Sequence, residues 1–403
     1  MSHARTTFVW MAVLSAGTLV LGMLRELVIA QHLQASASAD LFFRGVVVVG
    51  AARNFTLALL RSRWIPLPPG PGAAALLRTG LGACTGVAVA SIVTLGVVIP
   101  VELWWTPASL TFVACVTVAS YGAAVRALAE RNGAERRGVV LDWIPLVGTM
   151  LGTLWAARGD HALAMGATGG LTLGLLISTV LLWPAASRRG DAGAPAPSAV
   201  VRTPGLSLYV DTLIYVNLGL VDSLLSMYVF GEGEFALISY SYMFVNAILT
   251  VPTAGATILA LRLGGRAALA DAARLRRWAV VAGGVAGLGV VAMALVLRWS
   301  VVAAIIDGAV GWPVAGRIDL LVLASAPFAA LRLANTVGRQ LRVARDPDGV
   351  VSWDLAGLVV RVAMLGFGAA WLGPVASPLA LALAEAIQVG CWWRWSPASA
   401  VVK

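Results

Sequence analysis

The chain has 403 residues, of which 59% are hydrophobic and only 12% are charged, and its mean hydropathy is +0.87. Soluble domains carry about 25% charged residues, so this composition excludes an ordinary soluble protein and predicts a polytopic membrane protein. The net charge of +10 does not indicate a nucleic-acid-binding protein, because the arginines are spread over many short loops and not clustered on one face.

Twelve apolar runs of about 20 residues, the length that crosses a bilayer as an α-helix, follow one another along the chain. A basic connection rich in Gly, Pro and Ala, at 187–204, separates the first six runs from the last six. We therefore predict an all-α polytopic fold with two six-helix lobes, residues 1–186 and 205–403, joined by a cytoplasmic linker at 187–204. The expected spans are 7–31, 41–60, 77–100, 108–128, 139–157, 162–185, 206–230, 235–261, 278–298, 318–338, 350–372 and 377–396.

The basic residues predict the orientation of these spans. If the N-terminus is cytoplasmic, all but three of the basic residues outside the spans fall in segments that also face the cytoplasm. This distribution is the positive-inside pattern of membrane proteins, so we expect both termini in the cytoplasm. The first run is long enough to span and no cleavage site precedes Arg25, so we interpret it as a first helix and not as a signal peptide.

Five charged residues interrupt the first two apolar runs. Arg25 and Glu26 are adjacent in the first run, Asp40 and Arg44 open the second, and Arg53 follows Asp40 by 13 residues. A charge at the centre of a bilayer helix costs about 2.5–3.5 kcal/mol by insertion scales. Because this cost is repeated five times within two helices, we regard these residues as candidate functional residues.

The pattern of residues 18–53 resembles that of the lipid II flippase family, the MurJ/MviN proteins, of the multidrug/oligosaccharidyl-lipid/polysaccharide (MOP) exporter superfamily. The stretches that carry the resemblance are Arg25-Glu26, Ala39-Asp40-Leu41-Phe42-Phe43 and Arg53, and softer likenesses lie at 231–242, 305–309 and 331–335. The chain departs from the family at Leu19 and Met243, where the family tends to have Arg. It also has twelve expected spans where lipid II flippases commonly have fourteen.

The resemblance implies a flippase of the bacterial inner membrane that moves a polyprenyl-pyrophosphate-linked glycan by alternating access. The glycan would be lipid II or a unit of an exopolysaccharide or O-antigen. Arg25 and Arg53 are the candidate ligands of the pyrophosphate, because guanidinium groups pair with phosphate bidentately and stay charged. The alternative for Arg25 is an ion pair with Glu26 or Asp40 that holds the first two helices together. Asp40 is a candidate for the outer gate or for a cap of its own helix, and Arg44 for snorkelling to the outer interface.

A second candidate site lies in the second half of the chain. Four polar residues, Asp211, Asn217, Asp354 and Glu385, lie in or near its apolar runs. Because some relatives bind a cation in this lobe, the resemblance implies a site for Na⁺ or H⁺ as coupling ion. The alternative is a structural ion pair between Asp354 and Arg361, which lie two turns apart on one helix face.

Several function classes find no support in the sequence. It has no phosphate-binding loop, dinucleotide fingerprint or nucleophile motif, and no Cys/His cluster with metal-ligand spacing, so neither an enzyme nor a tightly bound cofactor is expected. Two alternatives stay open: a non-transporting scaffold of a cell-wall or polysaccharide assembly complex, which Leu19 and Met243 favour, and a MATE-like drug exporter. The expected partners are the glycolipid, membrane lipids and proteins of cell-wall or polysaccharide synthesis.

Overall fold

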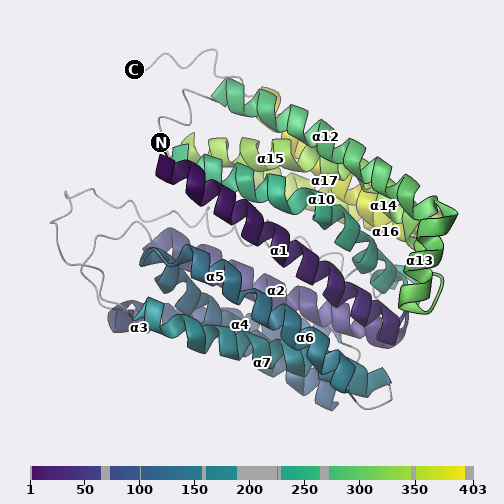
Figure 1. Cartoon of the computed structure of the whole chain (residues 1–403), viewed down its shortest axis with the longest axis horizontal. Coiled ribbons are helices and arrows are strands. Elements are labelled where there is room, and N and C mark those ends of the chain that lie inside the picture. The colour runs from purple at the N-terminus through teal and green to yellow at the C-terminus, as the bar shows by residue number, and fades with distance from the viewer. Residues whose placement is uncertain are drawn as a thin grey trace. The chain divides into compact units, whose positions relative to one another are not determined.

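The computed structural model describes residues 2–64, 73–99, 101–156, 160–187, 225, 228–263, 272–345 and 351–394, and within these ranges it contains helices and no strands (Figure 1). The elements are α1 (Ser2–Leu33), α2 (Ala37–Trp64), α3 (Ala73–Val98), η1 (Val101–Leu103), α4 (Pro107–Arg131), α5 (Glu135–Leu141), α6 (Trp143–Trp155), α7 (Asp160–Ala186), α10 (Glu234–Leu263), α12 (Ala272–Arg298), α13 (Ser300–Val310), α14 (Ala315–Ala324), α15 (Ala326–Arg345), α16 (Val351–Leu372), η2 (Gly373–Val375) and α17 (Ala376–Arg394). The predicted all-α fold class is confirmed.

In the described part of the chain, seven helical segments are long and apolar enough to cross a membrane, or up to eight if the bent pair α13–α14 is one span. A helix lies over each predicted run except 206–230, most of which falls outside the described residues. The total of twelve spans and the cytoplasmic termini stay predictions. The seven segments are Ala37–Leu60, Leu76–Val98, Pro107–Arg131, Arg137–Trp155, Leu163–Ala186, Leu275–Arg298 and Asp354–Cys391.

Contacts divide the chain into two compact units. The N-terminal unit comprises Val20–Met227 together with Gly231–Ala236, and the C-terminal unit comprises Met1–Leu19, Tyr228–Phe230 and Leu237–Lys403. The lobe boundaries proposed from the linker at 187–204 stay a prediction, since most of that linker lies outside the described residues.

In the N-terminal unit, α4 packs against α2, α3 and α7, and α6 packs against α7. The α6–α7 contact depends on glycine: a Cβ atom at Gly148 or Gly152 would meet the backbone carbonyl of Gly170 or Gly166 on α7. Close backbone approach of this kind is how small residues let membrane helices associate. A buried apolar cluster joins α2, α4 and α7 through residues that include Trp64 and Leu128.

The helix α4 occupies the middle of this unit, and its ends are set by local chemistry. Thr106 caps its N-terminus by accepting a hydrogen bond from the Ser109 amide at 3.4 Å, and Pro107 holds the first helical position. Beyond its last residue, Arg131, Gly133 has a φ of +77°, which is the left-handed conformation that glycine adopts most readily. The helix therefore holds its central residues, Arg126 among them, in a fixed register against α2 and α7.

In the C-terminal unit, α15 packs against α12 and α17, and α16 packs against α17. Gly283 of α12 lies so close to the Ala330 carbonyl of α15 that a Cβ atom there would collide with it. The bent pair α13–α14 turns through 115°. Its bend is held by Asp307, whose Oδ1 accepts hydrogen bonds from the amides of Val314 and Ala315 at 2.8 Å each.

Candidate functional site

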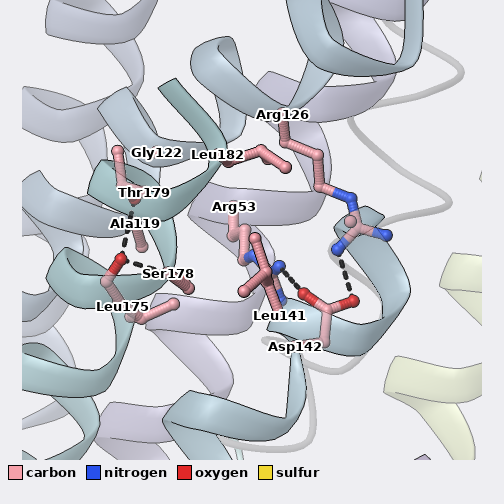
Figure 2. Close-up of a pocket in the computed structure, with 11 residues that line it drawn as sticks. Arg53, Ala119, Gly122, Arg126, Leu141, Asp142, Leu175, Ser178, Thr179 and Leu182 are labelled. Carbon is pink, nitrogen blue, oxygen red and sulfur yellow. Dashed lines mark hydrogen bonds and ion pairs between the residues drawn. The ribbon is translucent and has the colours of Figure 1, made fainter. Parts of the chain in front are cut away.

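Two arginines from different helices of the N-terminal unit meet on one carboxylate (Figure 2). Arg53 of α2 donates to Asp142 Oδ1, and Arg126 of α4 donates to Asp142 Oδ2. Arg126 also donates through Nε to Glu130 Oε1 at 2.9 Å, one turn further along α4. The cluster thus contains two guanidinium groups and two carboxylates, which makes it formally neutral.

Asp142 lies at the junction of two helices. It lies between α5, which ends at Leu141, and α6, which begins at Trp143, and its backbone remains in the right-handed helical region. Its side chain makes no capping hydrogen bond to the start of α6. The carboxylate is therefore directed at the two arginines and takes no part in ending or starting a helix.

A small cavity of about 20 Å³ adjoins the cluster. A space of this size holds about one water molecule. The side chains of Arg53 and Asp142 are 28% and 22% exposed, whereas that of Arg126 is only 12% exposed. The lining residues are Arg53, Ala119, Gly122, Arg126, Gly138, Leu141, Asp142, Leu175, Ser178, Thr179 and Leu182.

Asp40 caps a helix that is distant from it in sequence. Its Oδ2 accepts a hydrogen bond from the Gly233 amide and its Oδ1 from the Ala236 amide, both at 2.8 Å, at the first turn of α10. In return, Glu232 Oε1 accepts a hydrogen bond from the Ala37 amide at the start of α2, at 3.2 Å. Carboxylates at helix N-termini are favoured by the free amides and by the helix dipole. Asp40 also lies in the first turn of its own helix, α2, as the sequence suggested, while its two carboxylate oxygens accept hydrogen bonds at the start of α10. The gate role suggested for Asp40 stays a prediction.

Arg44 lies beside this cap. Its Nη2 is 3.9 Å from Asp40 Oδ2, and its Cζ is 5.9 Å from the centre of the Phe235 ring. At the same place Gly233 has a φ of +77°, and a Cβ atom there would collide with the carbonyl of Ala35. Asp40 and Arg44 thus form an ion pair against a backbone turn that only glycine fits. The snorkelling suggested for Arg44 stays a prediction.

Arg25 makes a more local contact than its candidate role suggested. It donates through Nη2 to Glu26 Oε1, on the adjacent residue of α1. None of the contacts among the described residues joins Arg25 to Asp40 or to Arg53. Because both partners lie on one helix, this ion pair does not tie α1 to α2. Arg25 Nε is buried and has no hydrogen-bond partner among the described residues, so the guanidinium keeps an unused donor.

The C-terminal unit contains a continuous chain of buried polar side chains on α15, α16 and α17. Glu385 accepts from Arg332 Nη1 at 2.6 Å and also from the Asn335 amide group. Asn335 in turn donates to Gln388 Oε1 at 2.5 Å, and Gln388 donates to Asp354 Oδ1 at 2.7 Å. The two candidate ion ligands, Glu385 and Asp354, are thus linked to one another through amide side chains.

The carboxylate of Asp354 also accepts from Arg339 Nε at 3.3 Å, which forms an ion pair with α15. The other two members of the suggested coupling-ion site, Asp211 and Asn217, lie outside the described residues. Among the described residues, no group of three or more His, Cys, Asp or Glu side chains could hold a metal ion. The coupling-ion site stays a prediction.

Known proteins share this fold at low sequence identity. No protein-family model and no curated protein matches the sequence. A structure titled as lipid II flippase MurJ in an inward closed conformation superposes with a TM-score of 0.71 at 11% identity, over 95% of this chain and 86% of that chain. The outward-facing conformation of a multidrug resistance MATE transporter gives a TM-score of 0.61 at 11% identity, over 96% of this chain and 94% of that chain.

A third solved structure, a MOP superfamily transporter from Pyrococcus furiosus whose title reports a reversed polarity of its binding pocket, gives a TM-score of 0.55 at 12% identity, over 96% of this chain and 94% of that chain. The chain has the MOP transporter fold. The resemblance inferred from the first two apolar runs is thereby confirmed at the level of fold, along nearly the whole length of the chain.

Within this MOP fold, the residues that sequence reasoning missed are Arg126 and Asp142. Asp142 is the one acidic residue in the predicted span 139–157, and that isolation was the signal that could have singled it out. Arg126 lies near the end of the predicted span 108–128 and was not among the candidate residues. Its functional interest comes from sharing Asp142 with Arg53, which lies 73 residues earlier in the sequence.

Proposed function

We propose that this chain is a flippase of the bacterial inner membrane, with twelve spans and both termini in the cytoplasm, that moves a polyprenyl-pyrophosphate-linked glycan by alternating access. The observation that carries the proposal is the pairing of Arg53 and Arg126 with a single oxyanion between membrane helices. The MOP fold supports it, because the MurJ flippase is among the proteins that share that fold.

The chemistry of such a substrate fits two arginines. A pyrophosphate headgroup carries about two negative charges, which are costly to bring into a region of low dielectric. Guanidinium groups offset that cost by bidentate, charge-assisted hydrogen bonds and cannot lose their own charge. Arg53 already donates one charge-assisted hydrogen bond to a carboxylate, and Arg25 has a buried Nε with no partner among the described residues. Both remain our candidate ligands.

Alternating access also requires contacts that form and break. The hydrogen bonds between Asp40 and the first turn of α10 are suited to this task, because they join residues from distant parts of the chain. In the proposed cycle these bonds hold one state and are released in the other, which is the gate role suggested for Asp40, with Arg44 beside it. Glu26 would hold Arg25 between substrate encounters.

The driving force would be the membrane potential or a gradient of Na⁺ or H⁺. Moving one charge through a potential of 100 mV is worth about 2.3 kcal/mol. A coupling cation would bind at Asp354 and Glu385, together with Asp211 and Asn217. Because Arg339 and Arg332 now pair with the first two carboxylates, the cation would have to displace a guanidinium from each.

A second candidate function is a MATE-like drug exporter. The observation that favours it is the likeness to MATE structures, at TM-scores of up to 0.61. The Arg53–Arg126 cluster gives this candidate no support, because both of its carboxylates are already paired with arginines and none is left to bind a cationic drug. A scaffold role in a cell-wall or polysaccharide assembly complex remains the alternative if no transport is found.

The test is rescue of a bacterium depleted of its lipid II flippase. Wild-type protein, Arg53→Ala and Arg25→Ala would be expressed at equal membrane levels, checked by immunoblot. The matched control is Arg298→Ala, which removes an arginine that is 60% exposed and pairs with Asp319 at 2.8 Å. We expect growth with wild type and the control, and loss of growth with the other two variants.

Failure of the wild type at normal membrane levels would remove lipid II as substrate. The same proteins reconstituted in vesicles with fluorescent polyprenyl-pyrophosphate glycans would then test the wider substrate class. Translocation that is unchanged in Arg53→Ala would refute the assignment of the site, and no translocation of any such lipid would refute the function.

A further inference from the structure

The Asp142 carboxylate occupies both arginines in the way that a phosphate would. One oxygen accepts from Arg53 and the other from Arg126, so the two guanidinium groups, from α2 and α4, converge on one pair of oxygens (Figure 2). A phosphate group presents the same edge of two oxygens to arginine. The geometry that holds Asp142 is therefore geometry that would also hold an oxyanion of a substrate.

Asp142 and a phosphate would compete for the same two donor groups. The cavity of about 20 Å³ accepts roughly one water molecule and no phosphate group. A pyrophosphate can take over Arg53 Nη2 and Arg126 Nη1 only if the Asp142 carboxylate moves away from them. The Asp142 side chain can turn away without breaking a helix, because it makes no capping hydrogen bond to the start of α6.

Arg126 is positioned to stay when Asp142 leaves. Its Nε donates to Glu130 at 2.9 Å, and both residues lie on α4. The guanidinium also packs against the backbone of α5 at Gly138, where a Cβ atom would lie 3.4 Å from Arg126 Nε. The Nε side of the Arg126 guanidinium is thus held by α4 and α5. Its Nη1 now donates to Asp142, and this is the group that would bind a new anion.

We propose that Asp142 is a built-in counter-anion, which occupies Arg53 and Arg126 in the unloaded protein and is displaced by the pyrophosphate of the substrate, and that Arg126 is a further substrate ligand. This inference rests on the proposed function. It explains why the charged cluster is neutral before substrate arrives: without Asp142, the half-buried Arg53 would lose this ion pair and Arg126 would keep only the one to Glu130.

The counter-anion also sets the affinity. A ligand that binds only when Asp142 has left has an apparent Kd equal to its intrinsic Kd divided by the fraction of protein in which Asp142 is displaced. Substrate is therefore held less tightly than two free arginines would hold it. A transporter needs this, because a substrate bound too tightly is not released on the other side of the membrane.

The test measures binding of inorganic pyrophosphate and farnesyl pyrophosphate to the purified full-length protein by isothermal titration calorimetry. Asp142→Asn keeps the volume but removes the charge, so we expect both probes to bind about tenfold tighter, equal to about 1.4 kcal/mol. Arg126→Gln should bind about tenfold more weakly. The matched control is Asp319→Asn, which removes a carboxylate from the Arg298 pair in the C-terminal unit and should bind as the wild type does.

A second measurement on the wild-type protein covers the case in which Asp142→Asn does not fold. If pyrophosphate displaces Asp142, amide hydrogen exchange in residues 135–145 should become faster when the probe is bound. A purely structural ion pair predicts equal or slower exchange. Equal or slower exchange, unchanged or weaker binding by folded Asp142→Asn, or unchanged binding by Arg126→Gln would each overturn the inference.

The vesicle assay separates this inference from the proposed function. If wild type moves the glycolipid but Asp142→Asn binds pyrophosphate no tighter, the counter-anion is refuted and the flippase stands. If Asp142→Asn binds tighter but no glycolipid moves, the anion site stands and the flippase fails. If neither wild type nor any variant binds either probe, the anion site fails, whatever the vesicles show.

Discussion

Removing the carboxylate of Asp40 should destabilise the protein more than any other single helix-cap substitution we consider. Asp40→Ala takes away two hydrogen bonds of 2.8 Å and leaves the buried amides of Gly233 and Ala236 without their acceptor. A hydrogen bond to a charged group contributes about 1.5–3 kcal/mol. Two such bonds, less the relaxation that lets water reach the freed amides, give an expected loss of about 3 kcal/mol in the free energy of unfolding.

Asp307 provides the matched control for this substitution. It also accepts two amide hydrogen bonds of 2.8 Å at the start of a helix, but it is half-buried, whereas Asp40 is only 3% exposed. A cap of ordinary exposure contributes about 1 kcal/mol, so we expect Asp307→Ala to cost that amount.

The assay is denaturation of the purified variants in mixed detergent micelles, followed by tryptophan fluorescence and circular dichroism. We expect wild type to be the most stable, Asp307→Ala to be intermediate and Asp40→Ala to be the least stable. The free energies of unfolding of the two variants should differ by about 2 kcal/mol. An Asp40→Ala protein that is as stable as Asp307→Ala would show that the burial of the α10 cap does not carry the energy assigned to it.

Two further substitutions test the packing and the buried charges. Gly152→Ala should lower the free energy of unfolding by about 1–3 kcal/mol, because the added methyl group meets the Gly166 carbonyl. Gly169→Ala, which has open space around it, should leave the stability unchanged. Equal stability of the two variants would argue against the close α6–α7 contact. Asp354→Asn should cost about 1.5–3 kcal/mol, because it removes the charge-assisted hydrogen bond between the buried Asp354 carboxylate and the half-buried Arg339. Adding Arg339→Gln should recover part of the loss in a double-mutant cycle, and additive losses would mean that the two side chains do not interact.

The helices could be predicted from the sequence because the decisive quantity is local. A run of about 20 apolar residues must satisfy its backbone hydrogen bonds internally in a bilayer, and an α-helix does so within the run. For the same reason Arg25, Asp40 and Arg53 could be recognised as functional candidates, since the cost of a charge in an apolar run follows from its position in the sequence. The resemblance to the MOP superfamily was likewise visible in one short stretch near the start of the chain.

The partners of those charges could not be predicted, because each depends on which helices pack together. Arg53 and Asp142 are 89 residues apart, and Asp40 and the Gly233 amide are 193 residues apart. Apolar periodicity says that a helix buries a face but not which neighbour covers it. The sequence determined the helices and the residues worth attention, and tertiary packing decided that Asp142 neutralises Arg53 and that Asp40 caps α10, because a buried charge is stabilised only by groups that the fold brings within hydrogen-bonding distance.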